Sequence, residues 1–298
     1  MNYKSINDLA GDLALWSSSV PQDIELVVGI PRSGLLAAII FSLQRNIPVT
    51  DVEGLIEGRT IGAGQRCKIS SDFLRKPRTV LVLDDSLWSG SEMASVREQL
   101  EVSNLPHHLL YGAVYVKPGK ERCLDLYCKS LPAPRVFEWN LFHSAMLESA
   151  CVDIDGILCR DPTEAENDDG VEYRRFVCEV EACLRPTVPI GWLVTCRLEK
   201  YRGMTADWLE RHGIRYHELV MMDYPDKAAR LRAGEHAIYK ANIYARRPAS
   251  LFLESSLPQA REIVRLSGKP VWCMENRSML LPGAVNPVSY THLTLPTN

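Results

Sequence analysis

Residues 80–93 constrain the fold more than any other stretch of the sequence, Val-Leu-Val-Leu-Asp-Asp-Ser-Leu-Trp-Ser-Gly-Ser-Glu-Met. The apolar run Val80–Leu83 predicts a buried parallel strand, because branched apolar residues without polar alternation suit a sheet that is covered on both faces. We expect this strand to end at Asp84 and Asp85, before a small-residue loop and a helix from Met93. Ligands of open α/β sheets bind at the carboxyl ends of the strands, so the two carboxylates mark a candidate site.

Composition places the chain among soluble globular proteins. Its 298 residues are enough for two domains, and 46% of them are hydrophobic and 24% charged. A formal net charge of −3 argues against general nucleic-acid binding, and the longest apolar run, Leu35 to Phe41, is too short to span a bilayer. Nine cysteines without Cys-x-x-Cys spacing and a start without a signal-peptide profile favour a cytoplasmic protein with reduced thiols.

Two series of alternating apolar strands and helical stretches divide the chain near residue 145. The alternation predicts an α/β fold with two Rossmann-like parallel-sheet domains, at 1–145 and 146–285. The uncharged segment 286–298 resembles translated linker sequence, and we expect a non-native or disordered tail there. The expected strands are 26–30, 80–83, 109–116, one that starts at 150, 190–195, 216–222, 251–253 and 271–274, and the expected helices are 35–44, 93–100, 199–212 and 259–267.

Two further segments of the first half suit a polyanion. Residues 27–35, Val-Val-Gly-Ile-Pro-Arg-Ser-Gly-Leu, predict a strand, a tight turn and a helix start, whose backbone N–H groups and Arg32 would face an anion. An ordinary strand–helix connection is the alternative. Residues 57–68 are rich in glycine and cations, which suits a flap that closes over a polyanion, with a solvated hairpin as the alternative.

These segments resemble the loops of the type I phosphoribosyltransferases, of the orotate phosphoribosyltransferase kind, over roughly residues 1–140. The resemblance implies that Asp84 and Asp85 bind the ribose hydroxyls of phosphoribosyl pyrophosphate (PRPP), which carries Mg²⁺. Trp88 and Glu92 depart from the family, in which threonines are common at these places. The implied 5-phosphate cradle is Ser86, Ser89, Gly90 and Ser91, the pyrophosphate loop holds Arg32, Ser33 and Gly34, and the flap adds Arg59, Arg66 and Lys68.

The acceptor of the phosphoribosyl group is not specified by any residue. Phe137 and Trp139 offer an aromatic shelf for a flat base, and core or interface packing is the alternative. The expected partners are PRPP and a small-molecule acceptor, with no nucleic acid and no membrane, and a homodimer is left open.

The second half opens with Asp153-Ile-Asp155-Gly directly after an apolar strand. Two carboxylates around a glycine turn can serve as a nucleophile and a general acid while they share Mg²⁺. This resembles the first motif of the haloacid dehalogenase (HAD)-like phosphatases, and the segment that ends Val-Thr195-Cys-Arg197 resembles the second, with Thr195 on the phosphate. Only residues 160–189 separate the two motifs, which implies a HAD-like fold with a minimal cap.

The remaining HAD-like motifs are less regular. Lys240 fits best as the lysine that neutralises an aspartyl-phosphate, and Lys227 is the alternative. Glu254 is implied as a third metal ligand beside Asp153 and Asp155, although serines follow it where a second carboxylate is usual. Magnesium held by one or two carboxylates, waters and substrate tolerates this loss.

The sequence therefore predicts a fused enzyme. The first domain would transfer phosphoribose from PRPP to a base-like acceptor, and the HAD-like domain would remove the 5-phosphate from the product. The alternative is a PRPP-sensing regulatory protein in which the first site binds without turnover and the HAD-like domain is degenerate.

Overall fold

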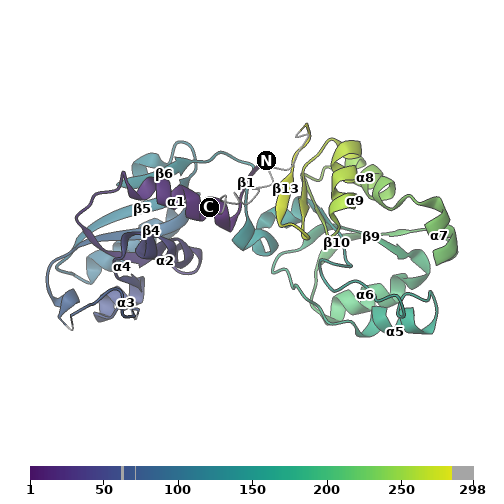
Figure 1. Cartoon of the computed structure of the whole chain (residues 1–298), viewed down its shortest axis with the longest axis horizontal. Helices are drawn as coiled ribbons and strands as arrows, with labels where there is room; N and C mark the ends of the chain where they lie inside the picture. Colours follow the sequence, from purple (N-terminus) through teal and green to yellow (C-terminus); the bar gives the residue numbers. More distant parts are fainter. Residues whose placement is uncertain (62–63, 71, 284–298) are drawn as a thin grey trace, which may run out of the picture. The chain divides into compact units, whose positions relative to one another are not determined.

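The computed structural model describes residues 1–61, 64–70 and 72–283. They form two compact units, Asn2–Trp139 and the residues from Asn140 onward, each built around a largely parallel sheet (Figure 1). The observed division falls after Trp139, and the sequence places it near residue 145. The predicted tail at 286–298 lies outside the described residues, as do Gly62 and Ala63 of the predicted flap. Within the described ranges, every helix is too short or too polar to cross a membrane.

The N-terminal unit contains a parallel sheet with the strand order β3-β2-β4-β5-β6 and a separate parallel pair, β1 and β7. Four of these strands are not predicted from the sequence: the short β3, the half-exposed β6, and the separate pair β1 and β7. The strands are β1 (Asn2–Lys4), β2 (Ile24–Gly29), β3 (Val49–Asp51), β4 (Thr79–Leu87), β5 (His108–Val116), β6 (Leu126–Ser130) and β7 (Arg135–Phe137). The helices are α1 (Ile6–Ser17), α2 (Ser33–Arg45), α3 (Val52–Glu57) and α4 (Ser91–Val102).

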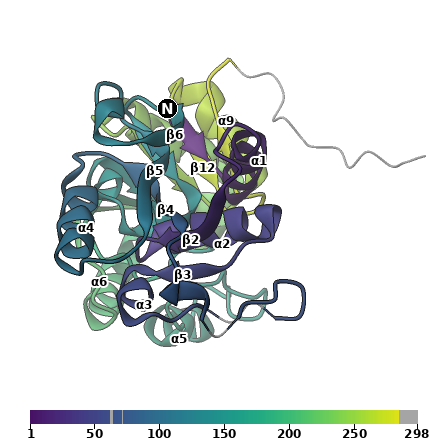
Figure 2. The ribbon, with the colours of Figure 1, turned by 90° about the vertical axis from the view of Figure 1, so that its left-hand side faces the viewer.

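Helices cover both faces of this sheet. Figure 2 shows α1 and α2 on one side of the strands and α4 on the other. Leu13 and Phe41 belong to the apolar cluster under α1 and α2, whereas Leu55 and Met93 belong to the cluster under α3 and α4. The uninterrupted apolar runs of β2 and β4 follow from this double cover.

The C-terminal unit has the strand order β10-β9-β8-β11-β12-β13, in which only the last pair is antiparallel among the described strands. The strands are β8 (Ala150–Val152), β9 (Ile190–Leu198), β10 (Tyr216–Met222), β11 (Leu251–Glu254), β12 (Val271–Cys273) and β13 (Ser278–Leu280). The helices are α5 (Val171–Glu179), α6 (Arg202–Arg211), α7 (Lys227–Ala233), α8 (His236–Arg246) and α9 (Leu257–Ser267). The predicted helix at 199–212 begins as a 3-10 turn, Glu199–Tyr201, and continues as α6.

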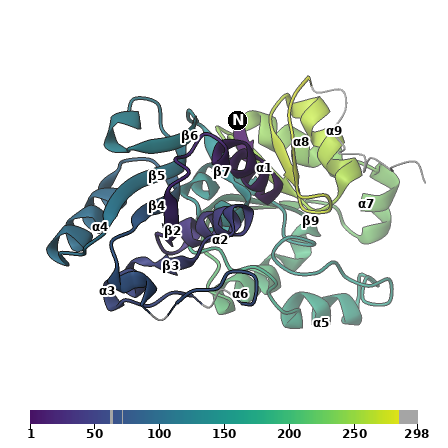
Figure 3. The ribbon, with the colours of Figure 1, turned by 60° about the vertical axis from the view of Figure 1, so that its left-hand side comes forward.

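The second sheet is also covered on both faces. In Figures 1 and 3, α8 and α9 lie on one side of it and α5 and α6 on the other. Tyr244 of α8 and Ile263 of α9 pack with Phe252 of β11 in one apolar cluster. On the other side, the fully buried Trp208 of α6 donates a hydrogen bond of 2.7 Å from Nε1 to the carbonyl of Val180.

Candidate functional sites

The strand order of the N-terminal unit places one candidate site between β2 and β4. Counted along the chain, the sheet has the order 2-1-3-4-5, so the direction of winding reverses between these two strands. Ligands of doubly wound sheets bind at such a reversal, outside the carboxyl ends of the strands. The predicted pyrophosphate loop follows β2, and the predicted acidic pair lies on β4.

β4 is longer than the sequence predicts, and its extra length carries the acidic pair past the end of β2. Its pairing with β2 stops where Gly29 lies opposite Leu83, whereas its pairing with β5 continues to Leu87. Asp84 and Asp85 therefore lie within the strand. This corrects the predicted strand end at Leu83, because the neighbouring β5 extends the ladder beyond the apolar run.

The start of α2 packs against this overhang. A Cβ atom at Gly34 would lie 2.8 Å from the carbonyl oxygen of Leu83 and 3.0 Å from Oδ1 of Asp84. Glycine permits this close approach because it has no side chain. The two loops are thus brought together, with Gly34 buried, Ser33 half-buried and Arg32 exposed at the start of the helix.

The two carboxylates of β4 interact with each other but differ in their other partners. Asp85 is 3% exposed and accepts a hydrogen bond of 2.8 Å from Nε1 of Trp139. Burial, and after it the charge of Asp85, raises the pKa of Asp84 to about 8. Neither carboxylate forms an ion pair with any residue that the structure describes. Such carboxylates are suited to neutral hydroxyl donors.

The serine turn lies just beyond the acidic pair. Gly90 has φ +88° and precedes α4, while the hydroxyls of Ser89 and Ser91 are 2.7 Å apart. Gly90 provides no side-chain cap at the helix start, and the backbone N–H of Ser91 donates a hydrogen bond of 3.2 Å to Oγ of Ser89. Glu92 is exposed in the first turn of α4. Ser86 is half-buried within β4 and not in the turn, which differs from the predicted cradle.

The predicted flap cations are spread over an exposed segment. Nε of Arg59 lies 2.5 Å from Oε2 of Glu57, and its Nη2 lies 3.6 Å from Oδ1 of Asp51. The hydrogen bond to Glu57 raises the pKa of Arg59. Arg66 and Lys68 are exposed. Arg59 is therefore engaged by carboxylates of its own surroundings, which the sequence does not predict.

Two cations that the sequence analysis does not assign to a site lie over the ring of Trp88, which directly follows β4. Nζ of Lys117 is 4.2 Å, and Cζ of Arg135 is 4.9 Å, from the centroid of the Trp88 ring. Nη1 of Arg135 is buried and has no hydrogen-bond partner among the described residues. Burial lowers the pKa of Arg135, and the charge of Asp85 opposes this effect. A lone arginine after Pro-Ala-Pro, in what reads as an inter-domain stretch, gives little signal in sequence.

The predicted aromatic shelf forms part of a stack. The ring of Phe137 lies 4.9 Å from that of Trp139 and 5.4 Å from that of Tyr115, with small angles between the ring planes. Tyr115 is fully buried, and its hydroxyl donates a hydrogen bond of 2.8 Å to Asp12. Because Trp139 also bonds Asp85, these contacts favour the alternative of core packing for Phe137 and give Trp139 a positioning contact.

The C-terminal unit has an equivalent reversal. Counted along the chain, its strands follow the order 3-2-1-4-5-6, which reverses between β8 and β11. Asp153 directly follows β8, and Glu254 is the last residue of β11. The backbone N–H of Asp153 donates to the carbonyl of Leu253 at 3.0 Å. The predicted first motif, at Asp153, and the predicted segment of Glu254 are therefore adjacent at the point where doubly wound sheets bind ligands.

Lys240 lies between these carboxylates. Its Nζ donates to Oδ2 of Asp153 at 2.6 Å, to Oε2 of Glu254 at 2.7 Å and to Oε1 of Gln259 at 3.2 Å. All three charged groups are buried. Burial alone would lower the pKa of Lys240, but Asp153 and Glu254 raise it above its ordinary value. The alternative, Lys227, bonds the carbonyl of Asn167 instead.

Asp155 is also paired with a buried cation. Nη2 of Arg197 lies 2.6 Å from Oδ1 of Asp155, and Nε lies 3.1 Å from Oδ2, so both carboxylate oxygens are engaged. The Arg197 side chain is fully buried, and its Cζ is 5.8 Å from the ring centroids of both Phe176 and Trp208. Sequence reasoning placed Arg197 in the second motif without a role, because its partner is 42 residues away.

A cavity of about 320 Å³ opens beside these groups. The predicted residues Asp153, Asp155, Thr195 and Lys240 all line it. Oγ1 of Thr195 accepts a hydrogen bond of 3.2 Å from the backbone N–H of Arg197, which fixes the hydroxyl at the strand. Burial raises the pKa of Asp153 to about 7, with Glu254 and Asp155 adding to the rise and Lys240 opposing it. The lining residues that the sequence analysis does not name include the titratable or charged Asp161, Arg230 and His236.

The predicted magnesium ligands fit the ion in part. Among the described residues, no three His, Cys, Asp or Glu side chains converge to form a complete metal site. Magnesium is usually held by one or two carboxylates together with water and substrate phosphate, so Asp153, which lines the cavity, suits it. The side chain of Asp155 does not, because Arg197 engages both of its oxygens. The predicted ligand Glu254 does not either, because it is fully buried, with Oε2 bonded to Lys240 and Oε1 to the backbone N–H groups of Ser255 and Ser256.

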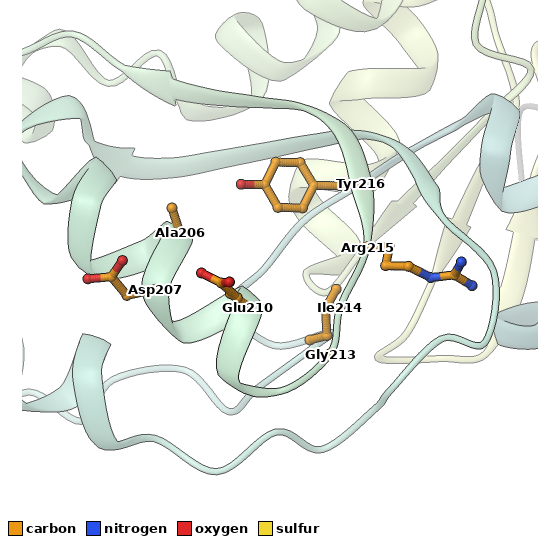
Figure 4. A pocket seen from close by; sticks show the side chains of 7 residues that line it. All are labelled: Ala206, Asp207, Glu210, Gly213, Ile214, Arg215 and Tyr216. Carbon is orange, nitrogen blue, oxygen red and sulfur yellow. The ribbon is translucent and has the colours of Figure 1, made fainter.

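A second depression, of about 420 Å³, lies between α6 and β10 (Figure 4). Asp207 and Glu210 of α6 line it, together with Tyr216 of β10, while the Arg215 side chain extends away from the two carboxylates. It contains none of the residues predicted for chemistry.

No family model and no curated protein matches the chain. Among solved structures, the xanthine-guanine-hypoxanthine phosphoribosyltransferase of Helicobacter pylori is similar, with 16% identity over 47% of this chain and 92% of that one and a TM-score of 0.35. A purine phosphoribosyltransferase from Pyrococcus horikoshii has 19% identity over 46% and 92%, with a TM-score of 0.34. A hypothetical protein from Neisseria gonorrhoeae with bound ppGpp has 14% identity over 47% and 89%, with a TM-score of 0.34. Likenesses at this level decide neither the fold nor the activity of the chain.

Proposed function

We propose that the N-terminal unit transfers phosphoribose from PRPP to a nitrogen nucleophile of a base-like acceptor. The observation that carries the proposal is the acidic pair on the overhang of β4, between the start of α2 and the serine turn of α4. Asp84 and Asp85 would accept hydrogen bonds from the two ribose hydroxyls. Ser89, Gly90 and Ser91 would bind the 5-phosphate through backbone N–H groups and hydroxyls.

The proposed reaction does not require a covalent bond between the substrate and the protein. The bond from the anomeric carbon to pyrophosphate breaks, the acceptor nitrogen bonds the same carbon, and the pyrophosphate leaves with its electron pair. Positioning and neutralisation of the leaving group supply most of the acceleration in such transfers. Arg32, with the backbone of Ser33 and Gly34, would bind the pyrophosphate. Arg59, Arg66 and Lys68 would approach it from the flap segment.

In the C-terminal unit, the same proposal assigns phosphate removal from the phosphorylated product. Asp153 would attack phosphorus, because it lines the cavity and its carboxylate is fixed by Lys240. Lys240 and Thr195 would then stabilise and orient the phosphoryl group. Magnesium would be held by Asp153 together with water and the substrate phosphate, and would supply charge neutralisation for the phosphoryl oxygens.

The decisive test measures pyrophosphate release from PRPP in the presence of a panel of purine and pyrimidine bases. The double variant Asp84→Asn, Asp85→Asn should lose PRPP binding in calorimetric titration, because neutral amides cannot replace charge-assisted bonds to the ribose hydroxyls. Asp23→Asn, at an exposed position, is the matched control and should bind as the wild type does. Unchanged PRPP affinity in the double variant would refute the assignment of the first site.

The alternative function is PRPP sensing. Glu92 favours it, because a carboxylate in the first turn of α4 places negative charge near the proposed 5-phosphate. Saturable PRPP binding without pyrophosphate release from any base would identify a sensor. In that case, phosphate release by the C-terminal unit would be tested separately with sugar phosphates.

A further inference from the structure

Two basic side chains line the cavity of the C-terminal unit without a role in the proposed chemistry. Arg230 lies in the last turn of α7, and His236 is the first residue of α8. The cavity, of about 320 Å³, has the size of a small-molecule site. It can therefore hold the leaving group of a substrate as well as the phosphoryl group that is removed.

Arg230 differs from Lys240 and Arg197 because it has no carboxylate partner. Those two cations are each paired with a carboxylate beside the cavity. Nη1 of Arg230 donates instead to the carbonyl of Cys196 at 2.6 Å, and the guanidinium makes no other hydrogen bond with the residues that the structure describes. Within that part of the chain, its positive charge is not neutralised.

The remaining nitrogens of Arg230 suit a ligand better than they suit packing. Nε is buried and has no hydrogen-bond partner in the described ranges. An unsatisfied buried donor is destabilising, so packing alone gives little reason to keep an arginine here. Nη2 is neither buried nor hydrogen-bonded within the same ranges, which leaves it available to an anion in the cavity. A guanidinium binds carboxylate and phosphate oxygens well, because its N–H groups match their geometry.

His236 adds a second donor near this guanidinium. It precedes Lys240 by four residues on α8, so the two side chains share one face of the helix and lie about 6 Å apart along its axis. The charges of Arg230 and Lys240 both act on the imidazole, and together with burial they lower the pKa of His236. A neutral imidazole has one N–H group that it can donate to an anion.

We propose that Arg230 and His236 form a second anion subsite beside the phosphate-removing site. The inference rests on the proposed function of the C-terminal unit and specifies its substrate class. The substrate is a phosphate monoester that carries a second anionic group, either a carboxylate or another phosphate. Asp153, Thr195 and Lys240 receive the phosphoryl group that is removed, and Arg230 and His236 bind the anionic group that stays on the product.

The test uses pairs of substrates that are matched except for the second anionic group. 3-Phosphoglycerate carries a carboxylate that glycerol 3-phosphate lacks, and fructose 1,6-bisphosphate carries a phosphate that fructose 6-phosphate lacks. Phosphate release is measured with the full-length protein and magnesium. Arg230→Gln should lower kcat/KM for a doubly anionic substrate by about tenfold or more, the usual effect of losing a hydrogen bond between charged groups. Its partner with one anionic group should lose less than about threefold.

The same helix offers a matched control. Arg232→Gln removes an exposed arginine of α7 and should leave both members of each pair unchanged. A selective loss in only one pair would support the subsite and identify its ligand as a carboxylate or as a phosphate. Equal losses with both members of each pair would show that Arg230 serves the removed phosphoryl group or the fold, and would overturn the subsite. Unchanged rates with all four compounds would overturn it as well.

A binding measurement separates the subsite from the phosphatase function. Asp153→Asn lacks the proposed nucleophile, so it should bind these compounds without turnover. In calorimetric titration, adding Arg230→Gln to this variant should weaken the binding of a doubly anionic compound about tenfold and leave that of its partner unchanged. If the wild type releases no phosphate and this difference persists, the phosphatase function fails and the subsite stands. Equal binding by the single and the double variant would overturn the subsite itself.

Discussion

Both units have carboxylates at the point where the strand order of the sheet reverses, but only those of the C-terminal unit are paired with buried cations. In the N-terminal unit, Asp84 and Asp85 have no ion-pair partner in the described part of the chain, and Asp85 is held by the neutral indole of Trp139. In the C-terminal unit, Asp153 and Asp155 are each bonded to a buried cation. The first site leaves its carboxylates without a cation, whereas the carboxylates of the second site are already compensated.

The difference suits the ligands that we propose. Ribose hydroxyls are neutral donors, and PRPP arrives with its own magnesium, so unpaired carboxylates can accept both. A phosphate monoester is an anion, and the carboxylates of Asp153, Asp155 and Glu254 would repel it if they had no cation partners. Lys240 and Arg197 remove that repulsion before the substrate binds. The comparison therefore predicts that loss of a buried cation harms the second site more than loss of a carboxylate harms the first.

The largest expected effect is that of Lys240→Met. The change leaves Asp153 and Glu254 buried without their cation, and breaking a buried pair in this way costs about 3–5 kcal/mol. We expect such a loss in the unfolding free energy of the C-terminal unit, measured by hydrogen exchange of β8 and β11 in urea. Lys200→Met removes a partly exposed pair with Asp169 and should cost less than about 1 kcal/mol. Equal losses would contradict the comparison.

A smaller effect of opposite sign is expected at the first site. Because the pKa of Asp84 is raised to about 8 in the folded protein, the folded state keeps a proton that the unfolded state loses above its ordinary pKa of 3.8. The stability of the N-terminal unit should therefore fall as pH rises from about 4 to about 8. Asp84→Asn should remove this fall and stabilise the unit at pH 8 by on the order of 1–3 kcal/mol. Thermal unfolding of both proteins across this range measures it, and parallel pH curves would refute the prediction.

Trp139→Phe tests the positioning of Asp85. The variant keeps an aromatic ring but loses the indole N–H, which donates to the carboxylate at 2.8 Å. We expect PRPP affinity in calorimetric titration to fall about tenfold, since a hydrogen bond to a charged group is worth roughly 1.5 kcal/mol. Trp16→Phe, in the apolar cluster under α1, is the control and should keep wild-type affinity while it lowers stability.

The sequence reveals the carboxylates and the lysine because their signals are local. Asp84, Asp85 and Asp153 follow apolar runs directly, and Lys240 and Glu254 lie in or beside short recognisable segments. The strand alternation also predicts two α/β units with parallel sheets. The strand orders that bring these residues together cannot be predicted from any single segment of the sequence. They are known only from the structure.

The partners of these residues escape prediction because they lie far away along the chain. Trp139 is 54 residues from Asp85, and Arg197 is 42 residues from Asp155. No local sequence pattern connects residues that are so far apart along the chain. Each contact forms only when the sheet is assembled. Asp161 is closer in sequence, but a single aspartate before proline reads as an ordinary turn residue.

The smallest structural effect is expected for Arg59→Gln. Arg59 is 49% exposed and contacts Glu57 and Asp51, so its loss should leave the melting temperature unchanged within error. If the flap segment binds pyrophosphate, the same variant should raise KM for PRPP several-fold, because a neutral amide cannot offset the charge of the leaving group. Arg45→Gln, at the far end of α2, is the matched control. An unchanged KM would show that Arg59 serves its neighbouring carboxylates alone and would restrict the pyrophosphate site to the start of α2.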